Sequence, residues 1–141
     1  MSTVLRNEVQ EMDIPNHHTD PSGLSPAVLA YLGDAVFELY IRETLIRSRK
    51  YPTAHALHRH TTALVCAPAQ ARMARALAAS FSAEEADILR RGRNAHCGQV
   101  PAGSEMAEYR LATGLECLIG YLHLSGQTDR LRELLEQALS G

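Results

Sequence analysis

Aromatic side chains are scarce in this sequence. Its 141 residues include no tryptophan, two phenylalanines and five tyrosines. Strands favour β-branched and aromatic residues, whereas the alanine and leucine that are abundant here favour helices. No segment shows the apolar–polar alternation that indicates a strand. The composition therefore predicts an all-α protein, and 141 residues suit one domain with its own core.

Cysteine is also rare. Cys66, Cys97 and Cys117 are far apart and form no CxxC pair. Three scattered thiols exclude a disulfide framework and favour reduced cysteines in the cytoplasm. The first 20 residues lack the basic start and apolar run of a signal peptide, and no stretch is long enough to span a membrane. We expect a soluble cytoplasmic protein.

Positive charge is not in excess over the whole chain. The formal net charge is -2 and the pI is about 6.4. A nucleic-acid partner would therefore have to be held by a local basic patch. Residues 1–23 are polar and contain prolines and a glycine, so we expect a flexible leader there and a single domain over residues 24–141.

The pattern of residues 24–46 predicts a helix that begins with Ser25 as its cap and Pro26 in its first turn. Apolar residues fall on two opposite faces, so we expect the helix to be largely buried. Asp34 and Glu38 fall within the second face, about 40° apart on the helical wheel. A buried carboxylate without a partner costs on the order of several kcal/mol. A divalent cation would compensate Asp34, and so would an arginine in an ordinary surface ion pair.

Five further helices are expected over residues 54–65, 69–79, 83–91, 105–124 and 128–139, which makes six in all. The fourth in chain order, residues 83–91, is opened by a capping box from Ser82 to Glu85. On the second helix, His55 and His58 are one turn apart, but no HExxH arrangement accompanies them, so a polar face is the simpler interpretation. On the fifth helix, Glu116 lies at the border of an apolar face. Its helical neighbours are small, so another helix can approach closely there: Ala112, Thr113 and Gly120.

The least regular stretch is residues 90–103, which we expect to form a loop. Arginines and an asparagine precede its glycines and proline, and these side chains suit phosphate oxygens. The alternative is a solubilising helix end, since cations favour a helix C-terminus. The phosphate-binding candidates are Arg91, Arg93 and Asn94, with Arg110 weaker because it could pair with Glu38 or Glu108.

Two helices and this loop together resemble the catalytic domain of ribonuclease III. Tyr31-Leu-Gly-Asp34 matches the end of the first signature, and Thr113-Gly-Leu-Glu116 followed by Leu118-Ile-Gly120 matches the second in part. The segments RRGRNAHCG and EYRLATGLECLIGYL resemble Mini-ribonuclease III more closely, the short bacterial class that consists of the catalytic domain alone. Two signature acids are replaced, by Ala30 and Thr113, and the short class shares both losses. His96-Cys97 stands where relatives tend to carry Lys-Ser.

The resemblance implies an all-α, dimeric ribonuclease III-like bundle that hydrolyses phosphodiester bonds in double-stranded RNA. Asp34 and Glu116 would be the catalytic residues and would hold Mg²⁺, with Mn²⁺ as a substitute, while Glu38 could act behind them or pair with an arginine. Two sites of a homodimer would cut opposite strands. The substrate that the resemblance implies is a ribosomal RNA precursor of the 23S type.

Two other functions stay open at this point. One is a non-catalytic RNA-binding or assembly protein that keeps the same fold. The other is a metal phosphohydrolase built on His55, His58 and Asp34, which would depend on a transition metal and be indifferent to Glu116.

Overall fold

The structure is a computed structural model that describes residues 20–95 and 105–141. Every regular element among these residues is helical, which confirms the all-α prediction. None of the described helices is long and apolar enough to cross a membrane. In chain order the elements are α2 (Pro26–Ser48), α3 (Ala54–Val65), α4 (Ala67–Leu77), the short 3₁₀ helix η1 (Ala78–Ser80), α5 (Ala83–Asn94), α6 (Met106–Leu124) and α7 (Thr128–Ser140).

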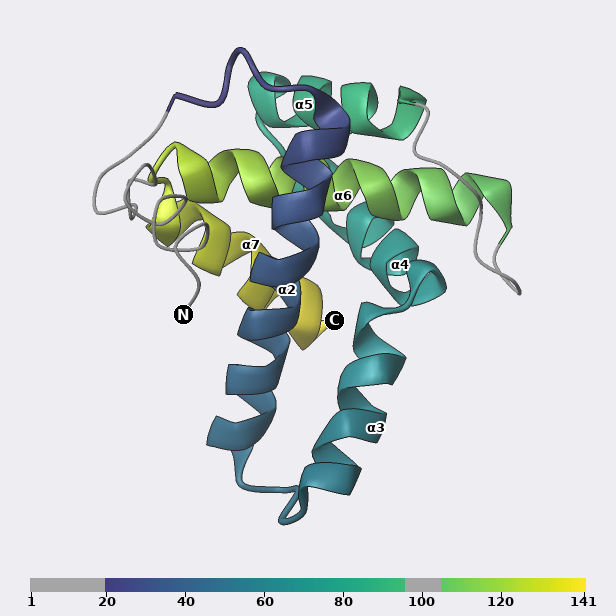
Figure 1. Ribbon diagram of the computed structural model, residues 1–141, viewed down its shortest axis with the longest axis vertical. Helices are drawn as coiled ribbons and strands as arrows, with labels where there is room; N and C mark the ends of the chain where they lie inside the picture. Colours follow the sequence, from purple (N-terminus) through teal and green to yellow (C-terminus); the bar gives the residue numbers. More distant parts are fainter. Residues whose placement is uncertain (1–19, 96–104) are drawn as a thin grey trace, which may run out of the picture.

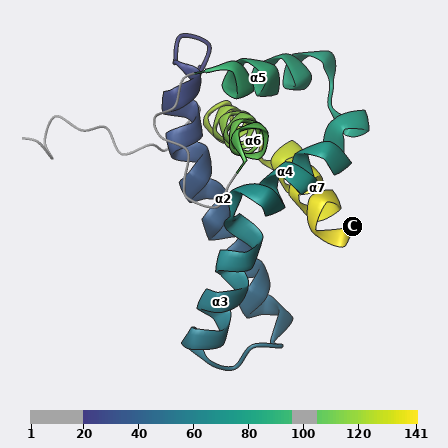
Figure 2. The ribbon, with the colours of Figure 1, turned by 90° about the vertical axis from the view of Figure 1, so that its right-hand side faces the viewer.

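Helix α6 is the element around which the others pack. Helix α2 crosses it, α5 runs alongside it, and α4 and α7 lie on the side away from α5 (Figures 1 and 2). Helix α3 lies beside the C-terminal half of α2, away from α5. The central position of α6 follows from its apolar content, because four of its large side chains are at most 2% exposed: Leu115, Leu118, Ile119 and Leu122.

Helix α2 begins as its sequence predicts but buries only one face. The Val28 N–H donates to the Ser25 hydroxyl at 3.2 Å, and Pro26 occupies the first turn. The buried side is a stripe at every fourth residue: Leu29, Gly33, Phe37, Ile41 and Leu45. The expectation of burial on two faces is wrong, since Tyr31 is 84% and Leu39 is 59% exposed. The apolar residues on that side are not covered by any described helix.

Glycines bring α6 into main-chain contact with both α2 and α5. A Cβ on Gly33 would lie 1.7 Å from the carbonyl oxygen of Glu116, and one on Gly120 would lie 2.1 Å from the carbonyl oxygen of Leu29. On the α5 side, a Cβ on Gly92 would lie 2.9 Å from the Cα of Gly114. Any side chain at these positions would force the helices apart, so glycine is required for this packing.

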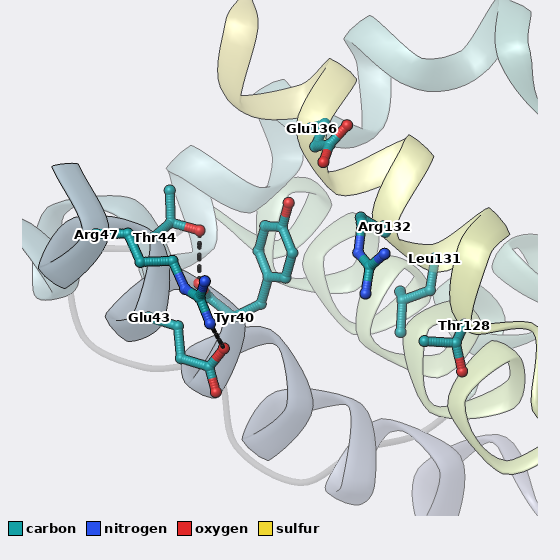
Figure 3. A pocket seen from close by; sticks show the side chains of 8 residues that line it. All are labelled: Tyr40, Glu43, Thr44, Arg47, Thr128, Leu131, Arg132 and Glu136. Carbon is teal, nitrogen blue, oxygen red and sulfur yellow. Dashed lines mark hydrogen bonds and ion pairs between the residues drawn. The ribbon is translucent and has the colours of Figure 1, made fainter.

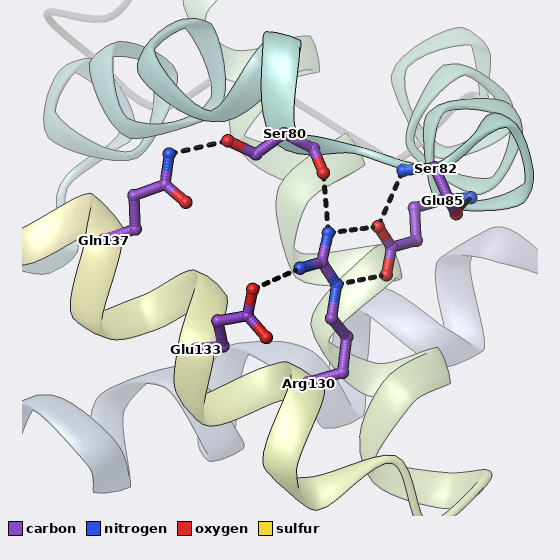
Figure 4. A network of polar contacts seen from close by, with 6 residues as sticks. All are labelled: Ser80, Ser82, Glu85, Arg130, Glu133 and Gln137. Carbon is purple, nitrogen blue, oxygen red and sulfur yellow. Dashed lines mark hydrogen bonds and ion pairs between the residues drawn. The ribbon is translucent and has the colours of Figure 1, made fainter.

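The predicted capping box opens α5. The Glu85 N–H donates to the Ser82 hydroxyl at 3.1 Å, and the Ser82 N–H donates back to the Glu85 carboxylate at 2.9 Å. The sequence did not indicate the second partner of Glu85, which is Arg130 on α7. Its guanidinium donates to both carboxylate oxygens at 2.8 and 2.9 Å and to the Ser80 carbonyl at 2.6 Å (Figure 4). This cluster fastens α7 to the start of α5.

Candidate active site

The two acids singled out from the sequence meet where α2 crosses α6. Asp34 follows Gly33 directly on α2, and Gly33 lies against the main chain of Glu116 on α6. Because no side chain separates the two helices there, the carboxyl groups approach closely enough to hydrogen bond. The pairing predicted between the two helices is therefore present, and the small residues around Glu116 are its cause.

Burial and the neighbouring acid together perturb Glu116. Its side chain is half-buried, whereas Asp34 is exposed, so the expectation of a buried Asp34 is wrong. Burial is the largest cause that raises the pKa of Glu116 to about 8, followed by the charge of Asp34 and the hydrogen bond between the two carboxyl groups. At neutral pH the pair thus tends to hold a proton, because two adjacent carboxylates repel each other.

The pair suits a hard divalent cation. Within residues 20–95 and 105–141, neither Asp34 nor Glu116 forms an ion pair with a cationic side chain. Two carboxyl groups that share a proton because no cation lies near them can exchange that proton for a metal ion. Their oxygen atoms are the ligands that Mg²⁺ prefers. The described residues bring together no group of three His, Cys, Asp or Glu suited to a metal, so substrate and water would have to complete the coordination.

The histidine-based alternative fails on this geometry. His55 and His58 are exposed on α3. They form no metal-binding group with Asp34 in the described part of the chain. The two histidines belong to a solvated face of α3, as their spacing alone suggested.

Glu38, one turn beyond Asp34, is paired with an arginine. Its carboxylate lies 3.6 Å from the Arg42 guanidinium on the same helix, and both side chains are largely exposed. Arg110 is exposed on α6, and no ion pair to Glu38 or Glu108 occurs between described residues. Of the two roles considered for Glu38, the structure contains the contact to an arginine.

The arginine-rich stretch begins as helix and not as loop, because α5 continues to Asn94. Arg91 pairs with Asp87 at 2.7 Å, and Arg90 bonds to the same carboxylate. Arg93 and Asn94 are exposed, and Arg93 has no ion pair within the described residues. Residues 96–104, which include His96 and Cys97, lie outside the described chain.

The end of α5 packs on α6 at the level of the acid pair but on another side of that helix. A Cβ on Gly114 would be 3.3 Å from the backbone nitrogen of Arg93. Gly114 precedes Glu116 by two residues, which is about 3 Å along the axis of α6 and about 200° around it. The sequence indicated both groups of residues, but the glycine contacts that bring them together appeared only as unexplained glycines in helices.

A separate hollow of about 650 Å³ opens between α2 and α7 (Figure 3). Tyr40 lies at its base and charged side chains from both helices line it, including the Glu43–Arg47 pair at 3.9 Å. Neither Asp34 nor Glu116 lines it. The acid pair is therefore distinct from this hollow, and its chemistry depends on the helix crossing alone.

Known proteins share this chain's sequence and fold. The ribonuclease III domain matches residues 27–127. The chain is 44% identical over 119 residues to the Mini-ribonuclease 3 of Symbiobacterium thermophilum, covering 84% of this chain and 91% of that protein. It is 46% identical over 113 residues to that of Thermoanaerobacter sp., covering 80% and 79%. It is 50% identical over 113 residues to that of Gloeobacter violaceus, covering 79% and 80%.

A solved structure agrees with these matches. The crystal structure of a Fusobacterium nucleatum protein superposes with a TM-score of 0.78 at 27% identity, covering 87% of this chain and 98% of that one. The ribonuclease III family consists of endoribonucleases that are generally metal-dependent. The domain match and the relatives named Mini-ribonuclease 3 agree with each other and with an acid pair at a helix crossing. The chain therefore belongs to the ribonuclease III family, in its Mini-ribonuclease 3 branch.

Proposed function

We propose that this ribonuclease is a Mg²⁺-dependent endonuclease that hydrolyses phosphodiester bonds in double-stranded RNA. The observation that carries the proposal is the contact of Asp34 with Glu116 at the α2–α6 crossing. No ion pair within the described residues neutralises either acid. An acid pair lacking a protein cation is suited to bind one from solution.

In this proposal Asp34 and Glu116 hold the magnesium ion, and Mn²⁺ can substitute for it. A bound divalent ion supplies Lewis-acid stabilisation of phosphate charge and makes water more acidic. Glu116 contributes its carboxylate once it gives up the proton that burial and Asp34 make it retain up to about pH 8, so metal binding is coupled to release of that proton. Asp34 is the exposed member and contributes its charge without a large loss of solvation.

Arg93 and Asn94 are proposed to hold the duplex by its phosphates, with Arg91 and Arg110 as further contacts. All four side chains are exposed. The main chain of Arg93 lies against Gly114 of α6, two residues before Glu116, so a phosphate held there is at the same level of α6 as the acids. A-form RNA is bound through phosphates and 2′-hydroxyls more than through base edges, which suits guanidinium and amide groups. Arg91 is the weaker donor because Asp87 already occupies it.

The proposed enzyme is a homodimer whose two sites cut opposite strands. The open side of α2 supports this, because it carries apolar side chains at roughly helical spacing: Val28, Tyr31, Leu39 and Ile46, each at least 50% exposed. In a two-fold dimer this face would pack against the same face of the partner. Tyr31→Arg should convert a dimer into a monomer in sedimentation experiments and leave the helical circular dichroism unchanged. A wild-type protein that sediments as a monomer would contradict the dimer.

By its resemblance to the short ribonuclease III class, we propose a ribosomal RNA precursor of the 23S type as the substrate and the cytoplasm as the compartment. In cells that lack the enzyme, large-subunit RNA should keep extended ends, and Asp34→Asn should fail to trim them. Normal ends in such cells would refute this substrate and leave the duplex nuclease untouched.

One reaction tests the main proposal. Purified protein, a long RNA duplex and Mg²⁺ should yield short duplex fragments, and EDTA should stop the cleavage. Single-stranded RNA of the same sequence should persist. Binding of the duplex without cleavage, under both Mg²⁺ and Mn²⁺, would instead identify a non-catalytic RNA-binding or assembly protein with this fold.

A further inference from the structure

The chain separates its charges along the sequence. Residues 44–83 contain no aspartate or glutamate but six of the fourteen cationic side chains. All sixteen acids lie outside this segment with the other eight cations. A protein with net charge -2 therefore has one strongly basic segment. It includes the α2–α3 connection, the whole of α3 and α4.

Within residues 44–83, positive charge is most concentrated at the connection between α2 and α3. Arg47, Arg49 and Lys50, called here the hairpin tip, are all exposed. The α2–α3 pair extends away from α5 and α6, and its connection lies at the far end (Figures 1 and 2). Arg47 makes a loose pair with Glu43 at 3.9 Å, its side chain being 82% exposed. Arg49 and Lys50 have no ion pair anywhere in the described residues.

Local contacts hold the tip in one conformation. Arg49 ends α2 with a left-handed φ of 57°, and its N–H donates to the Ile46 carbonyl at 3.2 Å. This conformation is uncommon for a residue other than glycine. The tip therefore has an arginine at a position where the backbone favours glycine. Tyr51 stacks on His60 of α3, with ring centroids 3.9 Å apart. The three cations are thus presented on an anchored turn.

The tip is far from the acids, at the C-terminal end of the same helix. Fifteen residues separate Asp34 from Arg49, which is about 22 Å of helix axis at ~1.5 Å per residue. Groups so far apart cannot contact one phosphate, but they can contact one stiff polyanion.

We propose that the hairpin tip binds the phosphate backbone of the RNA duplex at a distance from the cut, as a second contact of the same substrate. The inference rests on the proposed duplex substrate. The step is ~3.4 Å per base pair in B-form DNA and somewhat shorter in A-form RNA, so about 22 Å corresponds to roughly seven or eight base pairs. A duplex that extends less than this beyond the acids cannot reach the tip. The tip therefore makes affinity depend on duplex length.

The test compares two variants of equal charge change. Arg49→Gln/Lys50→Gln removes two positive charges from the tip, and Arg132→Glu changes the charge of α7 by the same amount. Arg132 is exposed and has no ion pair within the described residues. Affinity is measured by fluorescence anisotropy without divalent cation, so that no RNA is cut, on duplexes of about 10 and about 30 base pairs over a range of salt concentrations. Circular dichroism verifies that both variants fold.

The tip variant should bind the long duplex about tenfold more weakly at ~0.1 M salt, and its log–log salt slope should flatten by about 1.5, as expected for two lost phosphate contacts. Its affinity for the short duplex should match that of the wild type. The Arg132→Glu variant should match the wild type on both lengths.

Three results would overturn the tip contact: equal affinity of the tip variant for the long duplex, an equal loss on both lengths, or the same loss in Arg132→Glu. Polyglutamate that competes as well as RNA of equal charge would also overturn it and indicate an acidic protein partner. Length-dependent binding through the tip by a protein that cuts no RNA would support the tip contact and refute the endonuclease.

Discussion

Glu85 and Glu116 are both shielded from solvent, but their charged neighbours have opposite signs. Glu85 is buried and accepts hydrogen bonds from Arg130, which is the largest cause that holds its pKa below the ordinary value (Figure 4). Glu116 is half-buried and faces Asp34, and its pKa rises to about 8, with burial as the first cause. The first acid is matched by a cation of the chain itself, and the second is matched by another acid.

The contrast separates an acid that joins two helices from one that we propose binds a metal ion. A buried carboxylate with a bidentate arginine has its hydrogen bonds satisfied and fastens two helices. A buried carboxylate beside a second acid is electrostatically unfavourable until a proton or a cation from solution joins it. In the proposed function, Glu116 is the position left for an external cation, whereas Arg130 closes Glu85 to one.

The largest expected effect comes from removing the two acids of the proposed site. Asp34→Asn and Glu116→Gln should each lower the rate of RNA cleavage by at least about 10³-fold, because each withdraws a charge from the proposed two-acid metal site. Gel assays with a long duplex and Mg²⁺ measure this. Glu38→Gln is the matched control and should cost less, since Glu38 contacts Arg42. Near-normal cleavage by either acid variant would refute the assignment.

Breaking the structural pair should affect folding. Arg130→Met leaves Glu85 buried without its cation, and we expect a loss of about 3 kcal/mol in the free energy of unfolding, by urea titration. The double variant Arg130→Met/Glu85→Met should recover part of that loss, because the orphaned charge is gone. A single variant as stable as the wild type would show that the cluster does not fasten α7.

The pH dependence of stability should distinguish the two glutamates. Because folding raises the pKa of Glu116 from an ordinary 4.5 to about 8, its contribution to stability is complete below pH 4.5 and is lost as pH rises through 8. For the metal-free protein we expect a decline on the order of 2 kcal/mol over that window, after allowing for partial exposure. Glu116→Gln should flatten the decline, and an equal slope in both proteins would contradict the raised pKa.

The smallest effect concerns the arginines that end α5. Arg93→Ala should weaken duplex binding by a few fold and flatten the salt slope by about 0.7–0.9, the value for one phosphate contact. Arg91→Ala should cost less, because Asp87 already engages that side chain. The double variant should bind more weakly than either single variant and unfold like the wild type. Unchanged duplex affinity and an unchanged salt slope would show that RNA binds to another face. Arg72 and Arg75 of α4 would then be the next candidates.

Sequence reasoning found the features that depend on near neighbours or on motif residues. The Ser82–Glu85 capping box spans four residues, and the small residues around Glu116 indicated a close helix approach. The pairing of Asp34 with Glu116 followed from motifs whose spacing is set by the fold. These signals survive without knowledge of how distant segments pack.

The features that were missed depend on packing between distant segments. Arg130 lies 45 residues from Glu85, and no local pattern links them. The exposure of Tyr31 and Leu39 contradicts the prediction of burial on two faces, which arose because α2 is apolar around most of its circumference. Only the arrangement of neighbouring helices decides which apolar stripe is inside. The helical start of the arginine-rich segment was not predicted, because its arginines and Asn94 were grouped with the glycines and proline that indicate a loop.

The glycine contacts of α6 have a consequence for how this protein can vary. The separation of the two acids is set by main chain touching main chain, so no rearrangement of side chains can compensate for a methyl group at Gly33 or Gly120. In a saturation mutagenesis screen for activity, these two glycines should be as intolerant as the acids themselves, although neither carries a functional group. The polypeptide backbone thus sets the spacing of the two acids, at the positions where glycine has no side chain.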